Sequence, residues 1–554
     1  MKASLFGPFE NLTEDPDLYK TFQPQLEAYR SRLQEGILEE FKLPDSLVPD
    51  KFGYDVTRIA EKIMSDREIE ITEMSASKLV ELLTSGNLTS VEATRAFAKR
   101  ATAAHQLVNC CMEMFIEEGL ERAQYLDDYY KKTGKPIGPL HGLPISVKEQ
   151  FLYKGKRCNG AYVGMIDNFV DEWAILLKIL YESGAVFYVR TTEPQTTMHL
   201  CSGNNITGIC RNPHNTKLTS GGSSSGEGAI TAMKGSAIGV AADIGGSIRS
   251  PAAFCGVWGI RPTQKRLPLK GVFSAKEGKN EGVICVSGPI ARSPQDIELF
   301  MKTVIDSEPW NIDADLIPLP WRELEPPSVK TLKVAICYDD GVVAPTPPVL
   351  RALKHAAAKL SKAGAEVIEW TPLNVESLIA CCNTIYSAGE NQGLKKALAL
   401  SGEPVLELSK VAMSFGCGDD LLTANDIFQL AAYRDKQRDV YLTAMNQLGV
   451  DYILCPAYVN VAPEPETCHY WGYTALWNLL DFPNVVFPSG LKCDQRLDPK
   501  TTYKERSSIE AYEHGLYDPK VFEGAPIALQ LTGRRWKDEE LLQAAKVVSD
   551  TIFE

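Results

Sequence analysis

Thr219-Ser-Gly-Gly-Ser-Ser-Ser-Gly-Glu-Gly228 and Asp243-Ile-Gly-Gly-Ser-Ile-Arg249 are the two stretches of this sequence that decide its fold. Each contains a Gly-Gly-Ser turn, although glycine destabilises a helix or strand by roughly 0.5–1 kcal/mol relative to alanine. Two such turns indicate backbone N–H groups that remain available to donate hydrogen bonds to an oxyanion. The residues between them read as a helix over 227–234 and an apolar strand over 237–242. The region is therefore turn, helix, strand and turn, rather than a flexible Gly/Ser linker.

Two chemical interpretations of these turns remain. A phosphate-binding loop would need Gly-x-x-x-x-Gly-Lys-[Ser/Thr], and no Gly-Lys-[Ser/Thr] follows Gly221 or Gly245. A nucleophilic serine needs a base for its proton and N–H donors for the charge that develops on the carbonyl oxygen. None of the seven histidines lies in a motif that pairs it with a serine. The sequence therefore favours serine catalysis with a base other than histidine.

A lysine on a predicted strand is the alternative base. Ile145-Ser-Val-Lys148 alternates apolar and polar residues, as a strand does. Only a neutral lysine can accept a proton, so its pKa must fall from ~10.4 to ~7–8, which requires about 3–4 kcal/mol. Burial and hydrogen bonds to hydroxyl groups can supply this difference.

Helices and strands alternate along the rest of the chain, a pattern typical of an open α/β sheet. We expect helices over about 76–84, 89–104, 118–132, 171–182, 349–363 and 538–548. We expect strands over about 145–148, 185–189, 332–337, 366–370, 452–455 and 524–531. Residues 1–72, with an amphipathic pattern over 17–41, read as an N-terminal helical arm, and residues 73–554 as the catalytic domain.

One aromatic segment has two interpretations, core or pocket wall. The residues that form it are His469, Tyr470, Trp471, Tyr473, Trp477 and Phe482. Core packing is the commoner role of so dense a cluster, but the segment is also the best sequence-level candidate for pocket lining.

Composition excludes several classes of protein. A net charge of −13 and a pI near 5.3 argue against nucleic acid as the main partner. The 14 cysteines are scattered without a CxxC pair, so we expect reduced thiols and no metal site. The N-terminal residues do not form a secretory signal, and no run of ~18 apolar residues predicts a transmembrane segment. We expect a cytoplasmic protein without a cofactor.

Longer motifs resemble the amidase signature family. They are Gly142-Leu-Pro-Ile-Ser-Val-Lys148, Gly221-Gly-Ser-Ser-Ser-Gly-Glu-Gly228 and Asp243-Ile-Gly-Gly-Ser-Ile-Arg-Ser-Pro-Ala-Ala-Phe-Cys-Gly-Val-Trp-Gly-Ile-Arg-Pro262. Gly472-Tyr-Thr-Ala-Leu-Trp-Asn-Leu-Leu-Asp-Phe-Pro483 and Gly524-Ala-Pro-Ile-Ala-Leu-Gln-Leu-Thr-Gly-Arg-Arg535 resemble its eukaryotic branch, which contains fungal acetamidases and fatty acid amide hydrolases. The resemblance extends from about residue 75 to the end. It implies an α/β fold in which helices surround a mixed β-sheet core.

The resemblance also implies a Ser-cisSer-Lys triad. Carried over residue by residue, Ser247 matches the nucleophile and Lys148 the base. Ser223 matches the bridging serine, which in the family follows a cis peptide bond and relays the proton. The backbone N–H groups that match the family's oxyanion hole belong to Ile244, Gly245, Gly246 and Ser247.

Several neighbouring residues refine these expectations. Ser225 stands where the family generally has glycine, and its added hydroxyl either alters the proton relay near the triad or caps the following helix, of which we expect capping. Glu149 follows the predicted base where aspartate is more usual. Asp243 and Arg249 read as a charged pair that braces the second turn, with a substrate contact for Arg249 as the alternative. Thr197 matches a family position whose backbone carbonyl faces the active site.

The resulting functional prediction is hydrolysis of the C–N bond of a small carboxamide through an acyl-enzyme. Carbamates such as urethane, and esters, fit the same chemistry because only the groups that flank the carbonyl change. A membrane-associated fatty acyl amide hydrolase is one alternative. A subunit of a tRNA-dependent amidotransferase is another, and the acidic charge weighs against it. The expected partner is a small-molecule amide, and a homodimer is left open.

Overall fold

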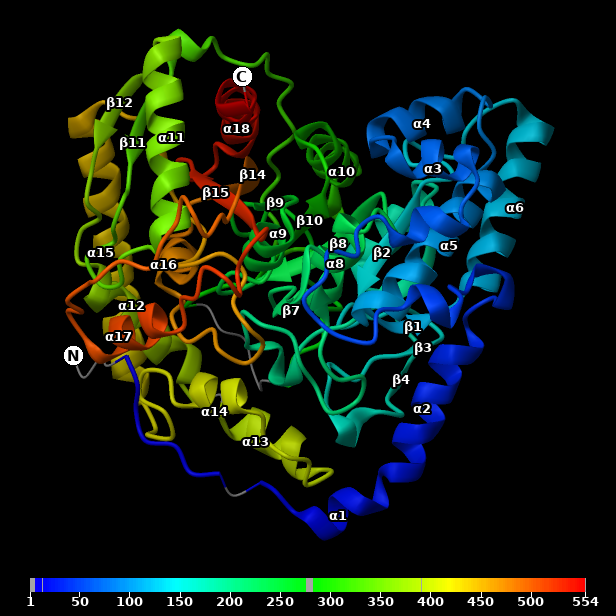
Figure 1. The fold of residues 1–554 in the computed structure, drawn as a ribbon, viewed down its shortest axis with the longest axis horizontal. Coiled ribbons are helices and arrows are strands. Elements are labelled where there is room, and N and C mark those ends of the chain that lie inside the picture. Colours follow the sequence, from blue (N-terminus) through cyan, green and yellow to red (C-terminus); the bar gives the residue numbers. More distant parts are fainter. Residues whose placement is uncertain (1–4, 12, 276–281, 390, 554) are drawn as a thin grey trace.

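The computed structural model describes residues 5–11, 13–275, 282–389 and 391–553. In these residues one mixed sheet of eleven strands runs through the molecule, and Figure 1 shows the strands with helices around them. In spatial order the strands are β1 (Cys111–Met114), β5 (Val186–Thr191), β2 (Pro144–Lys148), β8 (Ile238–Asp243), β10 (Val286–Ala291), β9 (Trp258–Arg261), β14 (Asn484–Lys492), β15 (Pro526–Thr532), β13 (Tyr452–Pro456), β11 (Lys333–Ile336) and β12 (Glu366–Glu369). Two short pairs lie outside it, β3 (Lys156–Arg157) with β4 (Phe169–Val170) and β6 (Arg211–Asn212) with β7 (Asn215–Thr219). This confirms the predicted α/β fold with a mixed sheet.

The helices are distributed along the whole chain. In order they are α1 (Pro16–Thr21), α2 (Gln23–Glu35), α3 (Asp66–Glu73), α4 (Ala76–Thr84), α5 (Ser90–Val108), α6 (Ile116–Thr133), α7 (Ile175–Glu182), α8 (Ser225–Ala232), α9 (Arg249–Cys255), α10 (Pro294–Asp306), α11 (Pro347–Ala363), α12 (Val375–Ser387), α13 (Asn391–Ala399), α14 (Glu407–Met413), α15 (Ala424–Leu448), α16 (Gly472–Leu480), α17 (Ser508–Gly515) and α18 (Asp538–Phe553). Among the described residues, none of these helices combines the length and apolar character needed to cross a lipid bilayer.

Strand direction places the site at one edge of the sheet. β2 lies between β5 and β8 and runs parallel to both, whereas β10 pairs with β8 in the antiparallel direction. Lys148 ends β2, and Asp243 ends β8. Because parallel strands present their carboxyl ends at the same edge, the predicted base and the second Gly-Gly-Ser turn begin close together.

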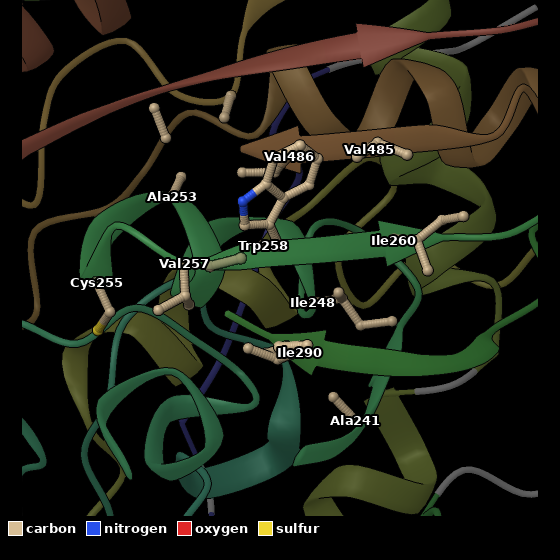
Figure 2. Packing of buried hydrophobic residues seen from close by; sticks show 14 of the residues in the cluster. Ala241, Ile248, Ala253, Cys255, Val257, Trp258, Ile260, Ile290, Val485 and Val486 are labelled. Atoms are coloured by element: carbon tan, nitrogen blue, oxygen red, sulfur yellow. The ribbon is translucent and has the colours of Figure 1, made fainter. Parts of the chain in front are cut away.

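The second turn is anchored in the hydrophobic core. Figure 2 shows Ile248 together with Trp258 of β9, Ile290 of β10 and Val486 of β14. Ile248 is fully buried, and burying a side chain of this size stabilises the fold by roughly 1.5–3 kcal/mol. Since Ile248 directly follows Ser247 in the chain, core packing fixes the position of the predicted nucleophile.

Most predicted elements are confirmed, with shifted boundaries. The helix predicted over 171–182 begins only at Ile175, because Ala174 is extended and donates its N–H to the Leu152 carbonyl at 2.7 Å. The helix predicted to end near 104 continues to Val108, where Asn109 in the left-handed region closes it. The amphipathic pattern over 17–41 forms two helices, which meet at Phe22.

The N-terminal arm packs on the rest of the chain. Leu26 and Tyr29 of α2 bury against Met112 of β1, and α2 ends so close to that strand that a Cβ on Gly36 would lie 1.8 Å from a backbone carbonyl. Figure 1 shows α2 beside β3 and β4. The expected boundary at residue 72 lies within α3, and the division into arm and catalytic domain stays a prediction.

Candidate active site

The first Gly-Gly-Ser turn connects β7 to α8 and places Ser223 inside the molecule. The Gly222–Ser223 peptide bond is cis, as the family resemblance implied. A Cβ on Gly222 would lie 2.2 Å from the Cys201 carbonyl oxygen, so only glycine fits at this position. Ser223 is 2% exposed. The turn therefore holds its serine against neighbouring backbone instead of presenting it to solvent.

Lys148 meets this serine from the end of β2. Its Nζ lies 2.6 Å from Ser223 Oγ, and its side chain is fully buried. Burial lowers the pKa of the Lys148 amine, against an opposing contribution from Glu193. Burial also raises the pKa of the Glu193 and Glu227 carboxyl groups, that of Glu227 to about 8. Because these acids are themselves pushed toward their neutral forms, the surroundings of Lys148 favour its neutral amine.

Ser247 shares a cavity with Ser223. The cavity, as lined by described residues, has a volume of about 140 Å³, and its wall also includes Thr197, Met198 and Phe273. Ser247 is 5% exposed. Its carbonyl accepts the N–H of Ser224 at 3.2 Å, which ties the second turn to the first. The structure thus brings the three predicted triad residues together, two in the cavity wall and Lys148 directly behind one of them.

The peptide groups of the second turn are held in fixed directions. The carbonyl of Ile244 accepts the Tyr386 hydroxyl at 2.5 Å, and that of Gly245 accepts the Thr474 hydroxyl at 2.6 Å. In a planar trans peptide the N–H points away from the carbonyl, so each contact also orients the N–H of the next residue. The N–H of Gly246 donates to Asp243 at 2.8 Å.

Two N–H groups of the predicted oxyanion hole are unengaged. Within the described part of the chain we find no acceptor for the N–H groups of Gly245 and Ser247, in contrast to that of Gly246. Such preorganised donors, oriented before the reaction, are what a developing oxyanion requires. The Tyr386 contact orients the N–H of Gly245, and the Thr474 contact orients that of Gly246. Neither residue could be identified from sequence, because no local motif connects it to the turn.

Asp243 and Arg249 form the predicted pair. Arg249 Nε and Nη2 each donate to one Asp243 carboxylate oxygen at 3.0 Å, and both side chains are fully buried. Arg249 Nη1 donates to Thr474, Asn484 and Gln530 at 3.0–3.1 Å. Burial alone would raise the pKa of the Asp243 carboxyl, but Arg249 brings it well below its ordinary value. The pair braces the turn, and the donors of Arg249 are engaged by protein groups rather than open to substrate.

Replacing Arg249 by methionine is expected to lower the free energy of unfolding by about 3–5 kcal/mol, because it leaves the Asp243 carboxylate buried without its partner. The depressed pKa of Asp243 contributes stability above its unfolded value of ~3.9, and this contribution is lost as the pH falls. Melting temperatures of wild type and Arg249→Met should therefore differ at pH 7 and approach one another below pH ~4. An unchanged melting temperature at pH 7 would show that the pair does not support the turn.

One expectation about a neighbouring residue is wrong, and of the two interpretations of the aromatic segment the commoner one, core packing, is confirmed. Ser225 is the first residue of α8 and not its cap, which is Ser224, and the buried Ser225 Oγ has no hydrogen-bond partner in the described residues. The aromatic segment belongs to the core instead of lining the cavity: Trp471 packs edge-on against Phe415 with ring centroids 4.9 Å apart. Trp471 also covers Gly245, where a Cβ would lie 2.8 Å from its ring.

Glu149, the other residue that departs from the family pattern, has a structural role. Its carboxylate accepts the N–H groups of Asn159 at 2.8 Å and Gly160 at 3.1 Å, and lies 3.7 Å from the Arg190 guanidinium. It therefore ties the segment after the base to a neighbouring loop. Among the described residues no group of three or more His, Cys, Asp or Glu side chains could hold a metal ion.

Comparison with known proteins identifies the class. A model of the family Amidase matches residues 92–542, and the chain belongs to this family of amidase signature hydrolases. Among its relatives, the acetamidase of Aspergillus oryzae is 40% identical over 94% of this chain and 96% of its own length. The acetamidase of Emericella nidulans is 38% identical over 94% and 96%. A solved structure described as a fatty acid amide hydrolase superposes with a TM-score of 0.95 at 44% identity, covering 98% of this chain and 97% of that one.

Proposed function

We propose that this amidase hydrolyses small carboxamides through an acyl-enzyme formed on Ser247. The observation that carries the proposal is the contact of 2.6 Å between the buried Lys148 amine and Ser223 Oγ, beside a cavity that Ser247 also lines. A buried amine with a lowered pKa can accept a proton at neutral pH, which is the requirement for a serine nucleophile without histidine. The acetamidase relatives support an amide substrate.

Each step of the proposed reaction uses a residue of this site. Lys148 takes the proton of Ser223, Ser223 takes the proton of Ser247, and Ser247 Oγ attacks the amide carbonyl. The unengaged N–H groups of Gly245 and Ser247 bind the oxyanion, that of Ile244 is a third donor implied by the family resemblance, and that of Gly246 stays with Asp243. The proton returns along the same path to the departing nitrogen, and water then releases the acid by the reverse sequence. Carbamates and esters would follow the same steps, because they differ from amides in the groups that flank the carbonyl and not in the carbonyl that Ser247 attacks.

The size of the cavity favours short acyl groups. A volume of about 140 Å³ is below the ~300–1,000 Å³ typical of sites for drug-sized ligands. A fatty acyl amide hydrolase is the second candidate, because a solved structure of that description is 44% identical to this chain. The two candidates share the triad and differ in how much apolar chain the site must hold.

A series of linear amides separates them. We expect kcat/KM to be highest for acetamide, propionamide or butyramide and to fall by about tenfold or more at octanamide, since forcing extra methylene groups into a filled site costs typically 1–3 kcal/mol. Ammonia release by the purified protein gives the measurement, with Ser247→Ala as the blank for contaminating amidases. If kcat/KM instead rises with chain length up to palmitamide, the chain is a fatty acyl amide hydrolase.

A further inference from the structure

A second pocket, of about 680 Å³, shares no lining residue with the cavity at Ser247. Three segments far apart in the sequence bring basic side chains to it. Lys265 lies after β9, Arg438 lies in α15, and Arg535 lies between β15 and α18. The chain as a whole has a net charge of −13, so the side chains that meet in this pocket have a charge opposite in sign to that of the protein.

The described carboxylates near the pocket do not neutralise this charge. Asp481 accepts Arg261 Nη2 at 2.8 Å and Arg535 Nε at 2.5 Å, so one negative charge is shared by two guanidinium groups. Asp435, exposed on α15, lies 3.2 Å from Arg438 Nη1. Lys265 makes no ion pair with any described acidic side chain. Counted over the described residues, the pocket has an excess of positive charge.

Several donors on Arg438 and Arg535 have no acceptor among the residues that the structure describes. Arg535 donates to Asp481 through Nε, and among the described residues neither of its Nη groups has an acceptor. Arg438 donates through Nε to the Leu480 carbonyl at 2.8 Å and through Nη1 to Asp435. Its Nη2 group has no acceptor among the described residues. Burial lowers the pKa of Arg438, and the positive charge of Arg535 lowers it further. A bound anion would relieve this repulsion between like charges.

The remaining wall of the pocket is mostly apolar, with Gln264 and Arg434 as its other polar residues. Ile317, Leu319 and Ile284 line it, together with Trp536. The Arg535 guanidinium lies over the Trp536 ring, 4.7 Å from its centroid, which restrains both side chains. The pocket therefore offers a cationic group of donors beside an apolar surface, and its volume falls in the range of small-molecule sites, ~300–1,000 Å³.

We propose that this pocket binds a small organic phosphate, whose head contacts Lys265, Arg438 and Arg535 and whose apolar body lies against Ile317 and Trp536. Guanidinium groups match phosphate oxygens in pairs, and a dianionic head meets three cations better than a carboxylate does. The proposal is independent of the reaction at Ser247, because neither pocket uses a residue of the other.

Calorimetric titration with phenyl phosphate tests it. We expect saturable binding to the wild-type protein, weaker binding of inorganic phosphate and of benzoate, and no binding of phenol. Lys265→Gln and Arg438→Gln should each reduce the affinity for phenyl phosphate at least tenfold. Lys436→Gln is the matched control, since Lys436 is exposed on the same helix α15 and does not line the pocket. Ser247→Ala should bind phenyl phosphate like the wild type.

Absence of saturable phenyl phosphate binding by the wild type at millimolar concentration would overturn the proposal. An equal loss of affinity in Lys436→Gln would do the same, because it would show general screening of surface charge. Melting temperatures establish that each variant is folded. Lys265 makes no described ion pair, so Lys265→Gln decides the question even if Arg438→Gln, which loses the contact with Leu480, proves unstable.

Discussion

Ser247→Ala is expected to reduce kcat/KM for acetamide by about 10,000-fold or more, the scale on which serine hydrolases lose activity without their nucleophile. The alanine variant keeps the cavity, the N–H donors and the Lys148–Ser223 contact, so substrate binding should persist while the acyl-enzyme cannot form. Mass spectrometry after mixing with an activated ester should show acylation of the wild type and none of the variant.

Ser225→Ala is the matched control for this experiment. Ser225 lies two residues after Ser223 and is equally buried, but its hydroxyl has no hydrogen-bond partner in the described residues. Removing an unpaired buried hydroxyl is nearly neutral or stabilising, so this variant should keep near-wild-type kcat/KM and melting temperature. If Ser247→Ala retained activity and Ser225→Ala lost it, Ser247 would not be the nucleophile.

Lys148→Met is expected to lower kcat/KM by about 1,000-fold or more, because Ser223 then loses the base that contacts it and general base catalysis alone contributes roughly 100- to 10,000-fold. The methionine side chain preserves most of the buried volume. Circular dichroism and melting temperature would establish that the variant is folded. Lys217→Met, a change at an exposed strand lysine, is the control and should leave kcat/KM unchanged.

The pH dependence of kcat/KM is a second test of the role of Lys148. Burial lowers the pKa of Lys148, and the reactive form is the neutral amine. Lowering the pH protonates this amine, so kcat/KM should fall on the acidic side by about tenfold per pH unit once the pH is below that pKa. Activity that is independent of pH from 5 to 9 in the wild type would remove Lys148 from the proposed proton path.

Much of the site could be predicted from sequence because its parts are local. The Gly-Gly-Ser turns, and the charged pair Asp243–Arg249 that spans one of them, lie within a few residues, and the structure confirms that the pair forms. The contacts that orient the turn could not be predicted, since Tyr386 is 142 residues from Ile244 and Thr474 is 229 residues from Gly245. The incorrect cap assignment at Ser225 was an error of one position in where α8 begins.

By itself the sequence determined which chemical groups are present and the local backbone that carries them: glycines for the turns, hydroxyls within them, and a lysine at the end of an apolar strand. Tertiary structure alone decided that Lys148 lies 2.6 Å from a serine 75 residues away, and that its pKa is lowered. It also decided the volume of the cavity and the convergence of Lys265, Arg438 and Arg535 in a second pocket. The reason is physical: burial, desolvation and enclosed volume depend on how distant segments pack together, and local residue patterns do not contain that information.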